Sequence, residues 1–189
     1  MPIRVETIEV KAFEKGGKTN EEIFDWNLAH AKSVILDMQQ EFQPTVFVLT
    51  KHTLFYVLLS TKVASATKSS PMDQVEPLIK QFLETQDKTG EVEAYQVIGE
   101  AWSKAFHKQS TAYKTLAYGD ISKMAARVEL LMEVVIRKGM DKRFRTFQIE
   151  REINGEKAVG FKKQPSALKM ESTKFPIIPK LADSWSGKI

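Results

Sequence analysis

The clearest pattern along the chain is a stripe of apolar residues at helical spacing. Apolar side chains recur at steps of three and four residues, at Phe24, Leu28, Ala31, Ile35, Met38 and Phe42. This spacing places side chains on one face of an α-helix. Thr19 stands three residues before Glu22, which is the spacing of a capping box, and Pro44 blocks continuation. The pattern predicts a helix that begins after Thr19 and runs toward Phe42.

Much of the remaining pattern is typical of β-strands. Residues 45–50 and 53–60 are rich in Val, Phe, Tyr and Thr and are separated by two residues, which indicates a hairpin. Both faces of these segments are apolar, as in strands that are covered on both sides. Residues 92–102 predict a further strand. Residues 3–10 predict a short opening strand whose alternation is interrupted.

The segment 127–137 fits two patterns. It alternates apolar and polar residues as a strand does, yet a helical stripe over 121–136 fits equally well. We interpret the segment as a strand because hairpin signals follow it. Alternating residues at 143–152 and 157–162 flank an Asn-Gly pair, which is the strongest short signal for a hairpin turn.

Two features complete the expected architecture. Ser70-Pro71 predicts the start of a second helix, and residues 104–120 show no clean period. The order of elements predicts an α+β domain over residues 1–163. We expect an antiparallel or mixed sheet of about five to six strands with two main helices packed on one face. Residues 164–189, which contain three prolines among large apolar side chains, predict an extended C-terminal tail.

Composition narrows the class of protein. The chain has 189 residues, which suits one domain with its own core. It has no cysteine, which excludes disulfides, thiolate catalysis and cysteine-based metal sites. The first residues lack the apolar stretch of a signal peptide, and the longest apolar runs are too short to span a membrane. We therefore expect a cytoplasmic protein without membrane contacts.

The positive charge of the chain is concentrated near the C-terminus. Residues 156–189 hold seven lysines against three acidic residues, which accounts for the whole net charge of +4. The remainder of the chain is neutral. Lysines in such a segment can supply contacts to the phosphates of a nucleic acid.

Two short strings carry a resemblance. The order of elements, with Glu100-Ala101-Trp102 ending one strand and Arg127-Val128-Glu129 opening a later one, resembles a loose group of uncharacterised prokaryotic and phage proteins. The resemblance covers about residues 20–162. It implies the α+β fold and a phage-related role, and it implies no activity.

Candidate chemistry is sparse. The sequence holds no phosphate-binding glycine loop, nucleophile elbow or zinc-protease motif. Glu100 and His107 are the catalytic candidates, since a carboxylate and an imidazole near a strand end can form an acid–base site. Trp102 either anchors the core or lines a ligand groove. Arg127, Glu129, Glu133 and Arg137 are interpreted as a solvated face. No cofactor and no metal are expected.

The C-terminal tail has three interpretations. It wraps its own domain, docks onto a partner protein, or serves as a basic arm on nucleic acid. We expect residues 168–185 to be ordered against a protein surface, of this chain or a neighbouring copy. The expected binding residues are Trp102, Lys162, Lys163, Lys169, Lys174, Phe175, Ile177, Ile178 and Trp185.

The function that these features favour is that of a non-catalytic interaction or accessory protein. It would dock onto itself, as a homo-oligomer, or onto a larger assembly through a protein partner. The alternatives are a nucleic-acid-associated protein that uses the basic tail, and a small enzyme with a carboxylate/His site.

Overall fold

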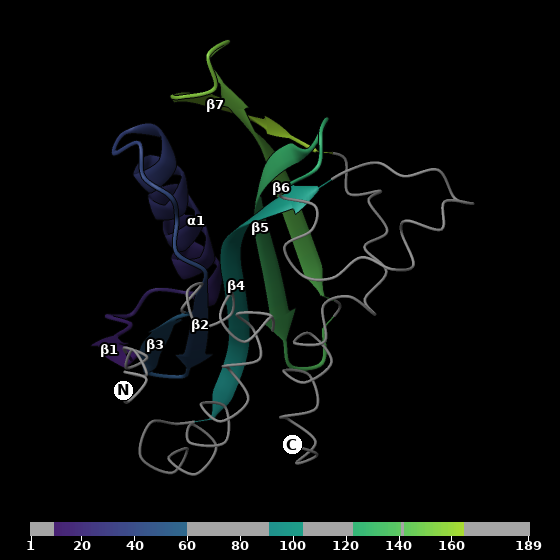
Figure 1. Ribbon diagram of the computed structural model, residues 1–189. Helices are drawn as coiled ribbons and strands as arrows, with labels where there is room; N and C mark the ends of the chain where they lie inside the picture. The colour runs from purple at the N-terminus through teal and green to yellow at the C-terminus, as the bar shows by residue number, and fades with distance from the viewer. Residues whose placement is uncertain (1–9, 60–90, 104–122, 141, 165–189) are drawn as a thin grey trace, which may run out of the picture.

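A seven-stranded antiparallel sheet with one helix against it makes up the described part of the computed structural model (Figure 1). The structure describes residues 10–59, 91–103, 123–140 and 142–164. Their elements, in chain order, are β1 (Val10–Glu14), α1 (Asn20–Leu36), β2 (Thr45–Thr50), β3 (Thr53–Leu58), β4 (Val92–Ser103), β5 (Val128–Arg137), β6 (Arg143–Arg151) and β7 (Ala158–Lys163). The strand order across the sheet is β1-β3-β2-β4-β5-β6-β7.

The expected fold class is wrong. The protein is sheet-rich, with seven strands and a single helix in the described residues, instead of two main helices on a sheet of five to six strands. Residues 10–14 form an edge strand of the sheet through backbone pairing with β3. The irregular alternation of side chains near the N-terminus did not reveal this pairing. The second helix, expected from Ser70-Pro71, lies outside the described residues.

The start of α1 follows from its sequence. The Thr19 hydroxyl accepts from the Glu22 N–H at 3.3 Å, and the Glu22 carboxylate accepts from the Thr19 N–H at 2.8 Å. These reciprocal bonds are the predicted capping box, and they satisfy backbone donors that a helix N-terminus leaves open. The buried face of α1 consists of Ile23, Phe24, Asn27, Leu28, Ala31 and Ile35.

The end of α1 comes earlier than the apolar stripe indicated. The helix stops at Leu36, and Gln39 has a φ of 53°, in the left-handed region. The Gln39 amide donates to the Leu36 carbonyl at 2.6 Å and to the Ala158 carbonyl at 2.9 Å, and its oxygen accepts from the Ala158 N–H at 2.9 Å. These tertiary bonds to β7 stabilise the turn, while Phe42 still reaches the core.

Both faces of the sheet are apolar. On the face that α1 covers, Phe47, Leu49, Ile98, Leu131 and Phe147 pack with the helix in one hydrophobic cluster. On the opposite face, cross-strand partners form buried rows such as Val57, Val46, Val97 and Val134. We expected the strands at 45–50 and 53–60 to be covered on both sides. This is confirmed for β2, which is buried at every residue, whereas most residues of β3 are only partly buried.

The second half of the sheet is a meander. The interpretation of residues 127–137 as a strand is confirmed by β5, which pairs with both β4 and β6. Gly155 has a φ of 75° in the turn between β6 and β7, which glycine adopts without the steric cost of a side chain.

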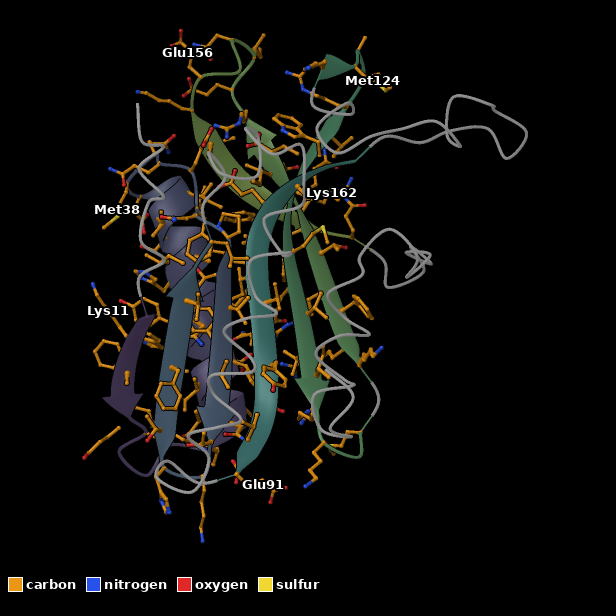
Figure 2. The ribbon with its side chains drawn as sticks, turned by 60° about the horizontal axis from the view of Figure 1, so that its bottom comes forward. Lys11, Met38, Glu91, Met124, Glu156 and Lys162 are labelled. Carbon is orange, nitrogen blue, oxygen red and sulfur yellow. The ribbon has the colours of Figure 1, made fainter. Side chains whose placement is uncertain are left out.

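No helix within the described residues is long and apolar enough to cross a membrane. Figure 2 places Lys11 on β1 and Lys162 on β7, at the two edge strands of the sheet.

Candidate functional site

Glu100, the predicted catalytic carboxyl group, lies on β4 where the segment after α1 crosses the sheet. One of its carboxyl oxygens accepts from the backbone N–H of Phe42. The negative charge of Glu129 on β5 acts on this carboxyl group, and the Arg151 guanidinium holds Glu129 with two bonds of 2.6 and 2.7 Å. The Glu100 carboxyl group therefore ties the segment before β2 to the centre of the sheet.

The electrostatics at Glu100 are unusual for a glutamate. Burial raises its pKa from 4.5 to about 7, and the negative charges of Glu129 and Glu41 act in the same direction, while the Phe42 N–H opposes the shift. A carboxyl group with a pKa near neutrality can donate or accept a proton, which is the property that acid–base catalysis needs. Among the described residues, no group of three or more His, Asp or Glu side chains is arranged to hold a metal ion.

The other residues predicted near Glu100 are only partly brought together. Trp102 is 40 % exposed, and the Arg127 guanidinium carbon lies 4.6 Å from the centre of its ring. This contact fits a cation–π pair at the rim of the sheet. His107 lies outside the described residues, so its predicted pairing with Glu100 stays a prediction.

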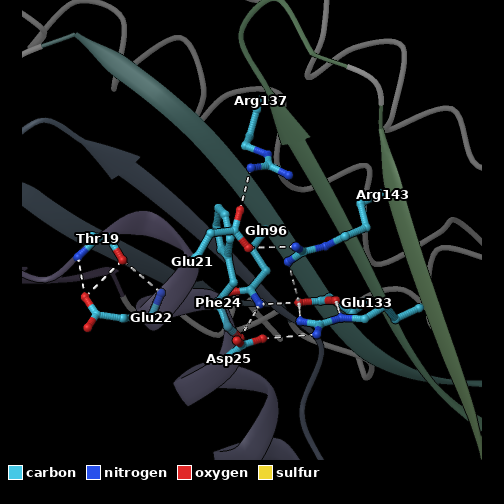
Figure 3. A network of polar contacts seen from close by, with 10 residues as sticks. Thr19, Glu21, Glu22, Phe24, Asp25, Gln96, Glu133, Arg137 and Arg143 are labelled. Carbon is cyan, nitrogen blue, oxygen red and sulfur yellow. Dashed lines mark hydrogen bonds and ion pairs between the residues drawn. The ribbon is translucent and has the colours of Figure 1, made fainter.

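A buried polar network lies between α1 and the sheet (Figure 3). The amide of Gln96 donates to the Phe24 carbonyl at 2.9 Å and to the Glu133 carboxylate at 2.7 Å, and its oxygen accepts from Asn27 at 2.7 Å. Gln96 and Glu133 are both 0 % exposed. These bonds fix the orientation of the Gln96 amide, because the Phe24 carbonyl and the carboxylate both require a donor.

Arginine side chains surround this network. Arg145 forms a two-pronged bond with Glu133 and also donates to Asp25 at 3.0 Å, and these carboxylates raise its pKa. Arg143 and Arg137 both donate to Glu21 on α1. The interpretation of Glu133 as part of a solvated face is wrong, because the helix covers it and the alternating pattern could not show that. The network anchors α1 to the sheet through ion pairs, and it leaves the Asn27 amide oxygen and two buried nitrogens of Arg143 without a hydrogen-bond partner.

The outer edge of β7 presents open backbone groups. The Gln164 N–H donates to the Thr146 carbonyl at 2.9 Å, so the backbone of Gln164 points toward β6. Backbone direction alternates along an antiparallel strand, so the N–H and C=O groups of Phe161 and Lys163 point away from the sheet. In the described part of the chain only β6 pairs with β7, and the Gln39 side chain occupies the edge only at Ala158.

Lysine side chains flank this open edge. Lys162 and Lys163 are exposed on β7. Lys32 of α1 places its ammonium nitrogen 3.6 Å from the ring centre of Phe147 and 5.5 Å from that of Phe161. Burial lowers the pKa of Lys32, and the positive charges of Arg145 and Lys163 lower it further, against the opposing effect of Glu133. The edge is therefore a positively charged strip beside two aromatic rings.

The residues predicted to bind a partner divide into two groups. The structure brings Lys162 and Lys163 to the β7 edge, and it places Trp102 at the end of β4. The others, Lys169, Lys174, Phe175, Ile177, Ile178 and Trp185, lie outside the described residues, as does the expectation that 168–185 are ordered. Lys32 was missed by the sequence reasoning, because a lysine on the polar side of a helical stripe resembles an ordinary solvated residue.

Comparisons with known proteins supply no relative. No protein-family model matches the chain, no curated protein matches it, and no solved structure matches it. The resemblance to uncharacterised phage proteins thus gains no further support, and the functional argument depends on the geometry of the chain itself.

Proposed function

We propose that the protein is a non-catalytic binding protein that docks onto a larger assembly by receiving an extended segment of a partner protein along β7. The observation that carries this proposal is the open edge at Phe161 and Lys163, whose backbone groups point away from β6. An extended segment supplies matching donors and acceptors when it adds to a sheet edge. The receiving strand is already formed, so most of the conformational entropy lost on binding is lost by the partner segment.

The partner at this edge is a different protein and not a second copy of the chain. In an antiparallel pair of β7 strands related by two-fold symmetry, Lys162 and Lys163 of one copy would approach the same lysines of the other. Like charges placed opposite each other destabilise a strand pair. Lysines on an edge strand also oppose indiscriminate pairing, so this edge favours a selected partner.

A pair of variants at one position tests the role of the open backbone. Lys163→Pro removes both the charge and the outward N–H, whereas Lys163→Gln removes only the charge. Peptides are first selected on the wild-type protein from a displayed library of random dodecapeptides. The selected peptides should then bind Lys163→Pro with a Kd about fivefold to tenfold higher than their Kd for Lys163→Gln. This difference corresponds to the loss of one hydrogen bond. Equal Kd values for the two variants would overturn the proposal.

Hydrogen exchange gives an independent readout on the wild-type protein. Saturation with a selected peptide should slow exchange of the Phe161 and Lys163 amides, because their N–H groups acquire an acceptor. Protection that appears only at other strands would contradict docking at β7. A single-stranded oligonucleotide serves as the comparison ligand. If the oligonucleotide binds in a way that depends on Lys162, and binds Lys163→Pro and Lys163→Gln with equal affinity, its binding depends on phosphate contacts and not on strand addition.

A further inference from the structure

The position of Lys32 restricts which segments the β7 edge can receive, and this inference rests on the docking function proposed above. Lys32 projects from α1 over the rings of Phe147 and Phe161, so its ammonium group lies on the face of β6 and β7 that α1 covers. Lys163 faces the same side of the sheet, because it is the cross-strand partner of Phe147, a member of the core cluster beneath α1. Two cations therefore border one face of the position that an added strand would take.

These two lysines differ from the arginines nearby. Arg145 is already engaged with Glu133 and Asp25. Within the described residues, neither Lys32 nor Lys163 makes an ion pair with a carboxylate. Glu150 is the cross-strand partner of Gly160 and so belongs to the opposite face from Phe161. The face that Lys32 and Lys163 share thus carries positive charge that no neighbouring acid on β7 neutralises, since residues 158–164 contain no acidic residue.

We infer that the segment received at β7 is acidic, with carboxylate side chains on the face of the sheet that α1 covers, where Lys32 and Lys163 bind them. Side chains of an added strand alternate between the two faces, so every second residue of the segment would approach this pair of lysines. The aromatic rings hold the Lys32 ammonium in place, so little side-chain freedom is lost when a carboxylate arrives. A cationic segment would meet repulsion at the same positions, which adds selectivity.

The test compares two synthetic peptides that differ only in charge. One alternates threonine with glutamate, and the other alternates threonine with glutamine. Fluorescence anisotropy measures the Kd of each peptide on the full-length protein at low and at high salt. We expect the glutamate peptide to bind about tenfold more tightly at low salt, with the difference shrinking as salt screens the charges.

Protein variants locate the effect. Lys32→Gln and Lys163→Gln should each weaken binding of the glutamate peptide about threefold and leave the glutamine peptide unchanged. Lys51→Gln is the matched control, because it removes the same charge from an exposed turn between β2 and β3. It should leave both Kd values unchanged. Thermal unfolding of each variant verifies that the fold is retained.

The outcomes separate this inference from the docking proposal. If both peptides bind equally and Lys163→Pro weakens both relative to Lys163→Gln, the edge receives extended segments without a preference for acids, and the inference fails alone. If the preference for glutamate persists in Lys32→Gln and Lys163→Gln, the carboxylates bind elsewhere and the inference also fails. If the dodecapeptides selected on the wild-type protein bind Lys163→Pro and Lys163→Gln equally, the docking proposal fails as well.

Discussion

Replacement of Glu100 by glutamine should stabilise the protein above neutral pH and have little effect in mild acid. The pKa of Glu100 is raised from 4.5 to about 7, chiefly by burial. The folded protein therefore holds its proton more tightly than the unfolded chain does. The stability associated with this group is fully present below about pH 4.5, declines as the pH rises, and is lost above about pH 7.

The magnitude follows from the size of the shift. At about 1.4 kcal/mol per pKa unit, the shift corresponds to about 3 kcal/mol, and solvent screening of this partly exposed carboxyl group reduces that to about 1–2 kcal/mol. The glutamine oxygen of Glu100→Gln can still accept from the Phe42 N–H. The variant remains neutral at every pH, so it avoids the penalty that the wild-type protein acquires on ionisation.

Urea denaturation at several pH values between 4 and 8, at constant ionic strength, measures the effect. Glu100→Gln should be about 1–2 kcal/mol more stable than the wild-type protein at pH 8 and nearly equal to it at pH 4. Glu152→Gln, at an exposed residue after β6, is the control and should track the wild-type profile. If Glu100→Gln is destabilised equally at all pH values, the raised pKa is not what shapes the pH dependence, and the reasoning is refuted.

Three further substitutions test the fold. Glu133→Ala should lower the free energy of unfolding by about 3 kcal/mol, because it leaves Arg145 and Gln96 without their buried partner; an unchanged urea midpoint would contradict the network. Thr19→Ala should cost about 1 kcal/mol, measured the same way, because it removes half of the capping box. Gly155→Val should cost at least about 1 kcal/mol, because the φ of 75° disfavours a branched side chain; a fully retained melting temperature would argue against this turn.

Short-range spacing in the sequence was enough to predict the local elements. The capping box at Thr19 and Glu22, the β2–β3 hairpin and the Asn154-Gly155 turn each depend on residues only a few positions apart. The physical preferences that act over such distances are those of caps, turns and alternating side chains. The early end of α1 was not predictable in this way, because it depends on bonds between Gln39 and Ala158 across the sheet.

The sequence also singled out Glu100 as a candidate carboxyl group, but it could not show the neighbours that perturb it. Those neighbours, Phe42 and Glu129, come from other segments and meet Glu100 only in the folded protein. The same holds for Glu133, which the alternation of β5 assigned to solvent and which α1 buries.

The proposed docking edge shows most clearly which features local sequence patterns determine and which only the tertiary structure decides. The sequence determined that lysines concentrate toward the C-terminus and that residues 157–162 form a strand. Only the tertiary structure decided that β7 is the last strand of the described sheet and that Lys32, more than a hundred residues earlier in the chain, lies over its aromatic rings. The physical reason is that strand order and helix placement are set by burial of apolar surface across distant segments, which no local pattern contains.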